Sequence, residues 1–176
     1  MIPPNRTIRS SDLKLFTDAS DLGYGGTFGN AWFQSGWTLE QLQHSIDYRE
    51  LYAIVAAAFT WGHQWKGKRI VFVTDNEPIT QVWDKGSSPS PPVMSLIRPL
   101  YMFAALQGFT VSFKYIKGSL NIAADALSRF QTDDFRDALP QADPHPTRIS
   151  EAVLRIQSPP PSKPSKNKQR TSSTTP

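Results

Sequence analysis

The sequence has no cysteine among its 176 residues. This absence excludes a disulfide framework and any metal site built on thiolates. Long apolar runs are missing too: the longest, residues 53–59, is far shorter than the roughly 20 residues of a membrane-spanning helix, and the N-terminus has no apolar signal core. We therefore expect a soluble protein without membrane contact, located inside the cell in the cytoplasm, the nucleus or both.

A general excess of one charge is also lacking. The formal net charge is +4, but residues 161–176 contain four basic side chains, Lys163, Lys166, Lys168 and Arg170, and no acidic one. The rest of the chain therefore has no net charge. Because a basic tail is most often a solvated segment, the overall charge gives little support for a polyanionic partner.

The composition changes after Arg129. Acidic residues and prolines alternate in the next stretch, and the last twenty residues are rich in Pro, Ser, Thr and Lys without hydrophobic periodicity. Such segments bury too little apolar surface to offset the entropy lost on ordering. We expect an N-terminal extension over residues 1–10, one folded domain over residues 11–130, and a largely disordered Pro/Ser/Lys-rich tail over residues 131–176.

Hydrophobic patterning within residues 11–130 predicts five strands and four helices. The expected strands are 13–18, 24–29, 31–38, 69–75 and 109–116, and the expected helices are 47–66, a short one after Asn76, 91–108 and 121–129. Tight turns join the first three strands, which should pair antiparallel, whereas helical crossovers allow the later strands to pair in parallel. The pattern predicts the α/β class, with a five-stranded mixed sheet flanked by helices.

Four carboxylates stand at the ends of these elements. Asp18 and Asp75 close the first and fourth strands, while Glu50 and Asp125 lie in the first turns of the long helix and the last helix. Strand ends and the termini of covering helices lie close together in such folds, so the four could share one pocket. Carboxylates that converge repel one another and need shared protons or hard cations, and oxygen ligands without His or Cys favour Mg²⁺ or Mn²⁺. Two such ions about 4 Å apart can activate a water and stabilise the leaving oxygen of a phosphodiester.

Each carboxylate also has a structural interpretation that competes with the functional one. Glu50 and Asp125 would suit the dipole of a helix N-terminus, Asp75 would cap a helix, and Asp18 would form an Asx turn. These explanations are favoured for each residue alone. The joint placement, with two apolar strands that both end in Thr-Asp, favours a common site.

The segments "LFTDAS", "GYGG", "DYRELYAIVAA", "VFVTDN" and "KGSLNIAADALSR" occur in this order. Together they resemble the ribonuclease H domain that follows the polymerase in retrotransposon reverse transcriptases, and "ADALSRFQTDDFRDALPQAD" resembles the DIRS-like, tyrosine-recombinase-encoding retroelements in particular. The resemblance covers about residues 13–143. It implies the ribonuclease H fold, endonucleolytic cleavage of the RNA strand of an RNA–DNA hybrid, two Mg²⁺ or Mn²⁺ ions, and a polymerase domain in the parent polyprotein. Carried over by motif, Asp18 would bridge both ions, Glu50 and Asp75 would complete one site, and Asp125 would complete the other.

The chain departs from related enzymes in two places. The loop "KGSLN" lacks the histidine that cellular type 1 enzymes have before the last helix, and the connection "DKGSSPSPP" is too short for the extra helix and basic protrusion with which some relatives hold their hybrid. We therefore expect slower turnover and a substrate affinity that depends on a fused polymerase domain.

Ser20, Asn76 and Lys117 are the candidate substrate contacts. Asn76 could reach the minor groove of the hybrid, where the 2′-hydroxyl distinguishes RNA from DNA, but a helix N-cap explains it equally well. Lys117 could contact a phosphate or simply be solvated. The glycines at 23, 25 and 26 are explained by a hairpin turn more readily than by close approach of a nucleic acid.

Two other functions compete with the nuclease. A non-catalytic module derived from a retroelement would use the same fold only to bind nucleic acid or to support other domains, but it has no reason to keep a repulsive acidic cluster. A transposase of the same superfamily is disfavoured because its acidic residues normally occur in a different order.

Overall fold

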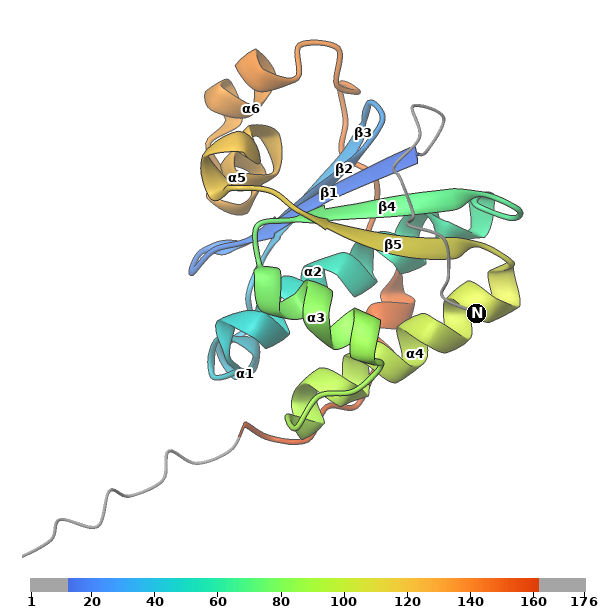
Figure 1. Ribbon diagram of the computed structural model, residues 1–176. Coiled ribbons are helices and arrows are strands. Elements are labelled where there is room, and N and C mark those ends of the chain that lie inside the picture. The colour runs from blue at the N-terminus through green and yellow to red at the C-terminus, as the bar shows by residue number, and fades with distance from the viewer. Residues whose placement is uncertain (1–12, 162–176) are drawn as a thin grey trace, which may run out of the picture.

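The computed structural model describes residues 13–161, in which five strands form one mixed sheet (Figure 1). Across the sheet the strand order is β3-β2-β1-β4-β5. The strands β1, β2 and β3 pair antiparallel, and β4 pairs in parallel with both β1 and β5. The strands are β1 (Leu13–Ala19), β2 (Gly23–Phe28), β3 (Ala31–Gly36), β4 (Arg69–Thr74) and β5 (Thr110–Tyr115). The expected fold class is confirmed.

Helices cover both faces of this sheet (Figure 1). The helices α2 (Ile46–Trp61), α3 (Glu77–Lys85) and α4 (Pro91–Gln107) pack on one face, and α5 (Ile122–Ser128) and α6 (Thr132–Ala138) lie on the other. Shorter elements are α1 (Leu39–Leu42) and the 3-10 turns η1 (Gly62–Gln64), η2 (Gly118–Leu120) and η3 (Glu151–Arg155). Within residues 13–161, no helix combines the length and apolar character that a bilayer crossing requires.

The helix α2 forms the centre of the larger core. Its first turn is capped by Ser45, whose side chain accepts a hydrogen bond from the Tyr48 amide. The residues Ala56, Ala57 and Ala58 have no exposed surface, as expected for a helix that is apolar on almost every side. The helix ends at Trp61, before residue 66 where the sequence predicted its end, because η1 tightens the chain into a 3-10 turn.

Gly25 shows why β2 contains glycine. The residue pairs with Asp18 across the β1–β2 ladder. Helix α5 lies directly over it, because a Cβ at this position would clash with the Leu127 Cβ. The sequence attributed the local glycines to a hairpin turn, but at position 25 the reason is the close approach of a helix to a strand.

Residues 131–161 pack on the domain, which differs from the expectation that the folded unit ends near residue 130. Helix α6 inserts Phe135, only 1% exposed, into a second core with Trp32 and Leu127. Further along, Val153 is equally buried and joins the core formed by α2 and α4. The expected N-terminal extension and the remainder of the expected tail, residues 162–176, lie outside the described residues.

This C-terminal segment also pairs with the edge of the sheet. The amides of Asp143 and Thr147 donate to the main-chain carbonyls of Asn30 and Trp32, over 2.8 and 2.7 Å. The Trp32 indole Nε1 donates in return to the Asp143 carbonyl, over 2.7 Å. The chain therefore runs along the outside of β3 before it crosses to α2.

Candidate metal centre

Three of the four predicted carboxylates meet at one point of the fold. Asp18 comes from the end of β1, Glu50 from the second turn of α2, and Asp75 from the residue after β4. One oxygen from each lies within 4.8 Å of the others. Because β1 and β4 are neighbouring parallel strands, their carboxyl ends bring Asp18 and Asp75 together, and α2 crosses beneath them with Glu50.

The cluster combines burial with an unsatisfied oxygen. The residues Asp18 and Glu50 are only 3% and 4% exposed, whereas Asp75 is half-buried. The Glu50 Oε2 atom has no hydrogen-bond partner within the described residues. A buried carboxylate oxygen without a donor is costly, and a hard divalent cation is the partner that an all-oxygen cluster accepts best. The residues present therefore fit a divalent metal ion.

The electrostatics of the cluster favour proton uptake as long as no cation is bound. Burial and then the charge of Asp75 raise the pKa of Asp18 to about 7, although the hydrogen bond from Ser128 acts in the opposite direction. Burial and the charge of Asp18 raise the pKa of Glu50 well above its ordinary value, and burial raises the pKa of Asp75 as well. The three groups cannot all be ionised at low cost, so protons or cations must offset their repulsion.

Asp125 lies beside this cluster but has a different partner. It stands in the first turn of α5, close enough that its charge raises the pKa of both Asp18 and Asp75. Its Oδ1 atom accepts a hydrogen bond from the Nε of Arg129, four residues on, over 3.0 Å. The fold thus brings the fourth carboxylate to the edge of the site, where an ion pair holds it.

The three candidate substrate contacts have different surroundings. The Ser20 hydroxyl is buried and donates to the Ser128 carbonyl over 2.8 Å. The Asn76 side chain caps α3 by accepting from the Ile79 amide, and it also donates to Asp47 Oδ1 over 2.8 Å. Both side chains are therefore engaged within the protein.

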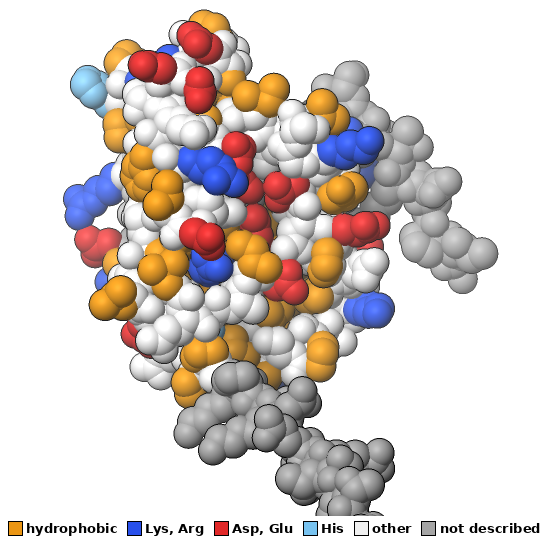
Figure 2. Space-filling view, turned by 90° about the vertical axis from the view of Figure 1, so that its left-hand side faces the viewer, with side chains coloured by type: hydrophobic (Ala, Val, Ile, Leu, Met, Phe, Trp, Pro, Cys, Tyr) orange, Lys and Arg blue, Asp and Glu red, His pale blue; other side chains and the backbone are white. Residues whose placement is uncertain are grey.

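Lys117, in contrast, is exposed at the rim of the cluster. The loop that carries it passes over Asp75, because a Cβ on the neighbouring Gly118 would lie 3.1 Å from the Asp75 Oδ2 atom. Figure 2 shows acidic side chains gathered at the middle of one face, with Lys and Arg side chains close around them. Of the three candidates, Lys117 is the one whose charged group is free to meet a ligand from solution.

The sequence motif contains two further residues of the site, Ser128 and Arg129, for which the sequence predicted no role. They follow Asp125 by three and four residues, the spacings that bring helical side chains to one face; Ser128 is the last residue of α5 and Arg129 its C-cap. Arg129 holds Asp125, and the Ser128 hydroxyl reaches Asp18 Oδ2 over 2.9 Å. Helical spacing indicates the first contact, but the second joins residues 110 positions apart and has no local pattern.

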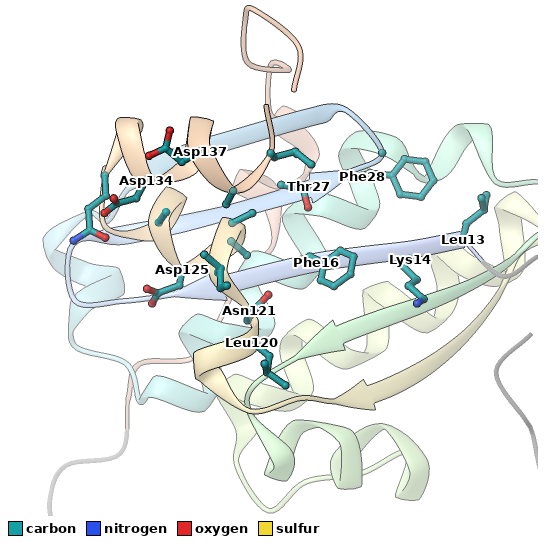
Figure 3. Close-up of a pocket in the computed structure, with 18 residues that line it drawn as sticks. Leu13, Lys14, Phe16, Thr27, Phe28, Leu120, Asn121, Asp125, Asp134 and Asp137 are labelled. Atoms are coloured by element: carbon teal, nitrogen blue, oxygen red, sulfur yellow. The ribbon is translucent and has the colours of Figure 1, made fainter. Parts of the chain in front are cut away.

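A cavity also lies away from the three carboxylates. It is a groove of about 1150 Å³ over the sheet face that carries α5 and α6 (Figure 3). Phe16 and Phe28 line it from the strands, Leu120 from η2, and Asp134 and Asp137 from α6. Asp125 lines this groove as well as the edge of the acidic cluster. The three carboxylates that converge, Asp18, Glu50 and Asp75, do not line the groove.

The sheet order, the helices on both faces and the placement of the acidic residues define a ribonuclease H-like fold. The chain superposes with a TM-score of 0.55 and 14% identity on the N-terminal RNase H domain of Rv2228c from Mycobacterium tuberculosis, solved as a fusion with maltose binding protein; the match covers 74% of this chain and 96% of that one.

Two further RNase H structures are similar at lower scores. For RNase H1 from the halophilic archaeon Halobacterium salinarum, the TM-score is 0.49 and the identity 14%, over 70% of this chain and 97% of that one. For an RNase H1 isolated from compost, the TM-score is 0.47 and the identity 15%, and the match covers 73% of this chain and 98% of that one. The sequence matches no protein-family model and no curated protein.

Proposed function

We propose that this protein is a metal-dependent endonuclease that hydrolyses the RNA strand of RNA–DNA hybrids. The observation that carries the proposal is the convergence of Asp18, Glu50 and Asp75 at the strand ends of a ribonuclease H-like fold, with a buried Glu50 oxygen that lacks a partner. A cluster kept only for stability would be replaced at little cost by apolar side chains, because buried like charges destabilise the fold.

The proposed cofactors are two Mg²⁺ or Mn²⁺ ions. Asp18, Glu50 and Asp75 would hold one ion, and Asp18 with Asp125 would hold the other. When bound, such ions activate a water molecule and stabilise the leaving oxygen of the phosphodiester. The carboxylates are positioned for this by their elements: a strand end fixes Asp18, and the capped helix α2 fixes Glu50.

Release of Asp125 from Arg129 is part of the proposal. Both side chains are substantially exposed, 40% for Asp125 and 50% for Arg129, so their ion pair is weak and exchangeable. A carboxylate that leaves Arg129 would be free to join Asp18. The guanidinium would then be available to a phosphate of the substrate.

The wider setting follows from the sequence resemblance. We propose that the chain acts in retroelement reverse transcription and derives from a DIRS-like element, within a polyprotein that also contains a polymerase domain. The domain without its C-terminal residues has no net charge, and its Ser20 and Asn76 side chains are engaged internally. The fused polymerase would therefore supply much of the affinity for the hybrid, inside the cell.

A cleavage assay tests the activity directly. We expect the full chain with Mg²⁺ or Mn²⁺ to cut the RNA strand of a labelled RNA–DNA hybrid and to leave double-stranded DNA and double-stranded RNA intact. Asp75→Asn removes a proposed ligand with little change in volume, and we expect it to bind the hybrid but to cut it at least 100-fold more slowly. Binding without cleavage by both proteins would instead support the non-catalytic module.

A further inference from the structure

Ser128 is a buried hydroxyl in contact with the acidic cluster. It is the last residue of α5, has no exposed surface, and its Oγ lies 2.9 Å from Asp18 Oδ2. Asp18 forms no ion pair with any residue in the range 13–161, so this hydroxyl is a direct donor to a carboxylate that is otherwise surrounded by acids. A hydrogen bond to an ionised acceptor is shorter and stronger than a neutral one.

The single hydroxyl hydrogen has two acceptors within reach. The Asp125 carbonyl lies 2.8 Å from Ser128 Oγ, one helical turn back, and Asp18 Oδ2 lies at nearly the same distance. A serine hydroxyl donates one hydrogen, and a charged carboxylate attracts it more strongly than a main-chain carbonyl. The Asp125 carbonyl also already accepts a hydrogen bond from the Arg129 amide. The geometry therefore favours donation to Asp18.

The position of Ser128 is fixed from two sides. The Ser20 hydroxyl donates to the Ser128 carbonyl over 2.8 Å and also accepts from the amides of the β1–β2 turn. The neighbouring Leu127 packs against Gly25, which leaves no room for α5 to approach β2 more closely. The backbone of Ser128 is thus held by contacts from two sides, and a supported backbone helps a side chain to orient another group.

We propose that Ser128 is a positioning residue that orients the Asp18 carboxylate toward the cation site. With Oδ2 held by the hydroxyl, the carboxylate cannot rotate freely about its last side-chain bond. This inference rests on the proposed function, because it assigns Ser128 to the same metal centre. Partners that hold a metal ligand in place typically contribute 10-fold to 100-fold in metal affinity or activity.

The test uses Mn²⁺ as the probe and compares Ser128→Ala with Thr60→Val in the full chain. Thr60 is a suitable control because its buried hydroxyl also donates to a carbonyl one turn back, that of Ala56 over 2.7 Å, but on α2, where it accepts from the Ser150 amide and contacts no carboxylate of the cluster. Free Mn²⁺ is measured by electron paramagnetic resonance during titration, so the reading does not depend on activity. Thermal unfolding reports the loss of stability in each variant.

For Ser128→Ala we expect Mn²⁺ binding to weaken by about 10-fold or more and kcat on the hybrid to fall by a similar factor with KM unchanged. Thr60→Val should lose stability but bind Mn²⁺ like the unchanged protein. Ser128→Thr keeps the hydroxyl and should restore most of the affinity. If Ser128→Ala instead binds Mn²⁺ normally and only unfolds at a lower temperature, Ser128 is structural and the inference fails.

The outcome for the unchanged protein separates this inference from the function on which it rests. Mn²⁺ binding and hybrid cleavage by the unchanged protein, together with normal Mn²⁺ binding by Ser128→Ala, would overturn only the role of Ser128. Failure of the unchanged protein to bind Mn²⁺ at all would overturn both proposals.

Discussion

Two carboxylates of the acidic cluster, Asp18 and Glu50, are buried where a charge is costly. Asp18 and Glu50 are almost fully enclosed, and no basic side chain within residues 13–161 forms an ion pair with either. The fold compensates in part, through the Ser128 hydroxyl on Asp18 and the main-chain amide of Ala19 near Glu50. The rest of the compensation must come from protons or from a cation, which links the stability of the protein to pH and to metal.

At the scale of single residues we therefore predict an inverted pH dependence of stability without metal. The pKa of Asp18 rises from 3.8 to about 7 on folding, so between these values the folded protein binds more protons than the unfolded chain. Stability should be highest near the ordinary pKa of aspartate, fall as the pH rises toward 7, and stay low above it. In EDTA we expect Tm to fall by roughly 5 °C or more between about pH 5 and pH 8.

The same measurement contains its control. Because the side chain of Asp18→Asn cannot ionise, the Tm of this variant should decrease much less between pH 5 and pH 8. The variant should also be more stable than the unchanged protein near pH 8. Addition of Mg²⁺ should raise the Tm of the unchanged protein most at high pH, where the carboxylates are charged. A Tm that is constant over this range in EDTA would contradict the burial of an ionisable cluster.

At the scale of elements, the important contact is the one between α5 and the sheet. This short helix and its C-cap provide Asp125, Ser128 and Arg129. Its position is set by Gly25 of β2 and by the Asn121 side chain, which donates to the Thr17 carbonyl over 2.9 Å. The site thus depends on how closely one helix approaches one strand.

We predict that Gly25→Ala destabilises the protein by about 1–3 kcal/mol, because the added methyl group meets the Leu127 Cβ and the helix backbone behind it. Chemical denaturation measures the loss, and Mn²⁺ titration shows whether the shift of α5 disturbs the metal centre. Gly36→Ala in β3 is the matched control. Its new methyl group would have only the Leu22 carbonyl nearby, at 3.8 Å, and equal losses in both variants would refute the packing explanation.

At the scale of the whole molecule, the sequence predicted the sheet and the convergence of Asp18, Glu50 and Asp75. Alternation and helical periodicity extend over many residues in 13–129, so local patterns agree with the fold, and Asp18 and Asp75 follow from the rule that strand ends meet. Sequence reasoning failed where single residues act alone. Phe135 and Val153 are single apolar residues of a largely polar segment that pack into the two cores, so no periodic pattern indicates them. The Ser128 contact to Asp18 joins distant parts of the chain.

We therefore predict that residues 131–161 are needed for a stable domain. A chain that ends at residue 130 would expose the core around Trp32 and Leu127 and remove Val153 from the core beside α2. Loss of a buried Phe side chain alone typically costs about 3–5 kcal/mol. Calorimetry should show a much lower Tm than for a chain that ends at residue 161, and equal Tm values would place the domain end near residue 130 after all.

The pairing of residues 143–147 with β3 has a consequence for self-association. An uncovered outer strand is a template onto which another polypeptide can add, and this is a common start of aggregation. Here the carbonyls of Asn30 and Trp32 already accept hydrogen bonds from the protein's own chain. On that flank a second copy cannot easily add a strand beside Asn30 and Trp32, so any sheet formed between two copies would have to start at the opposite edge, β5.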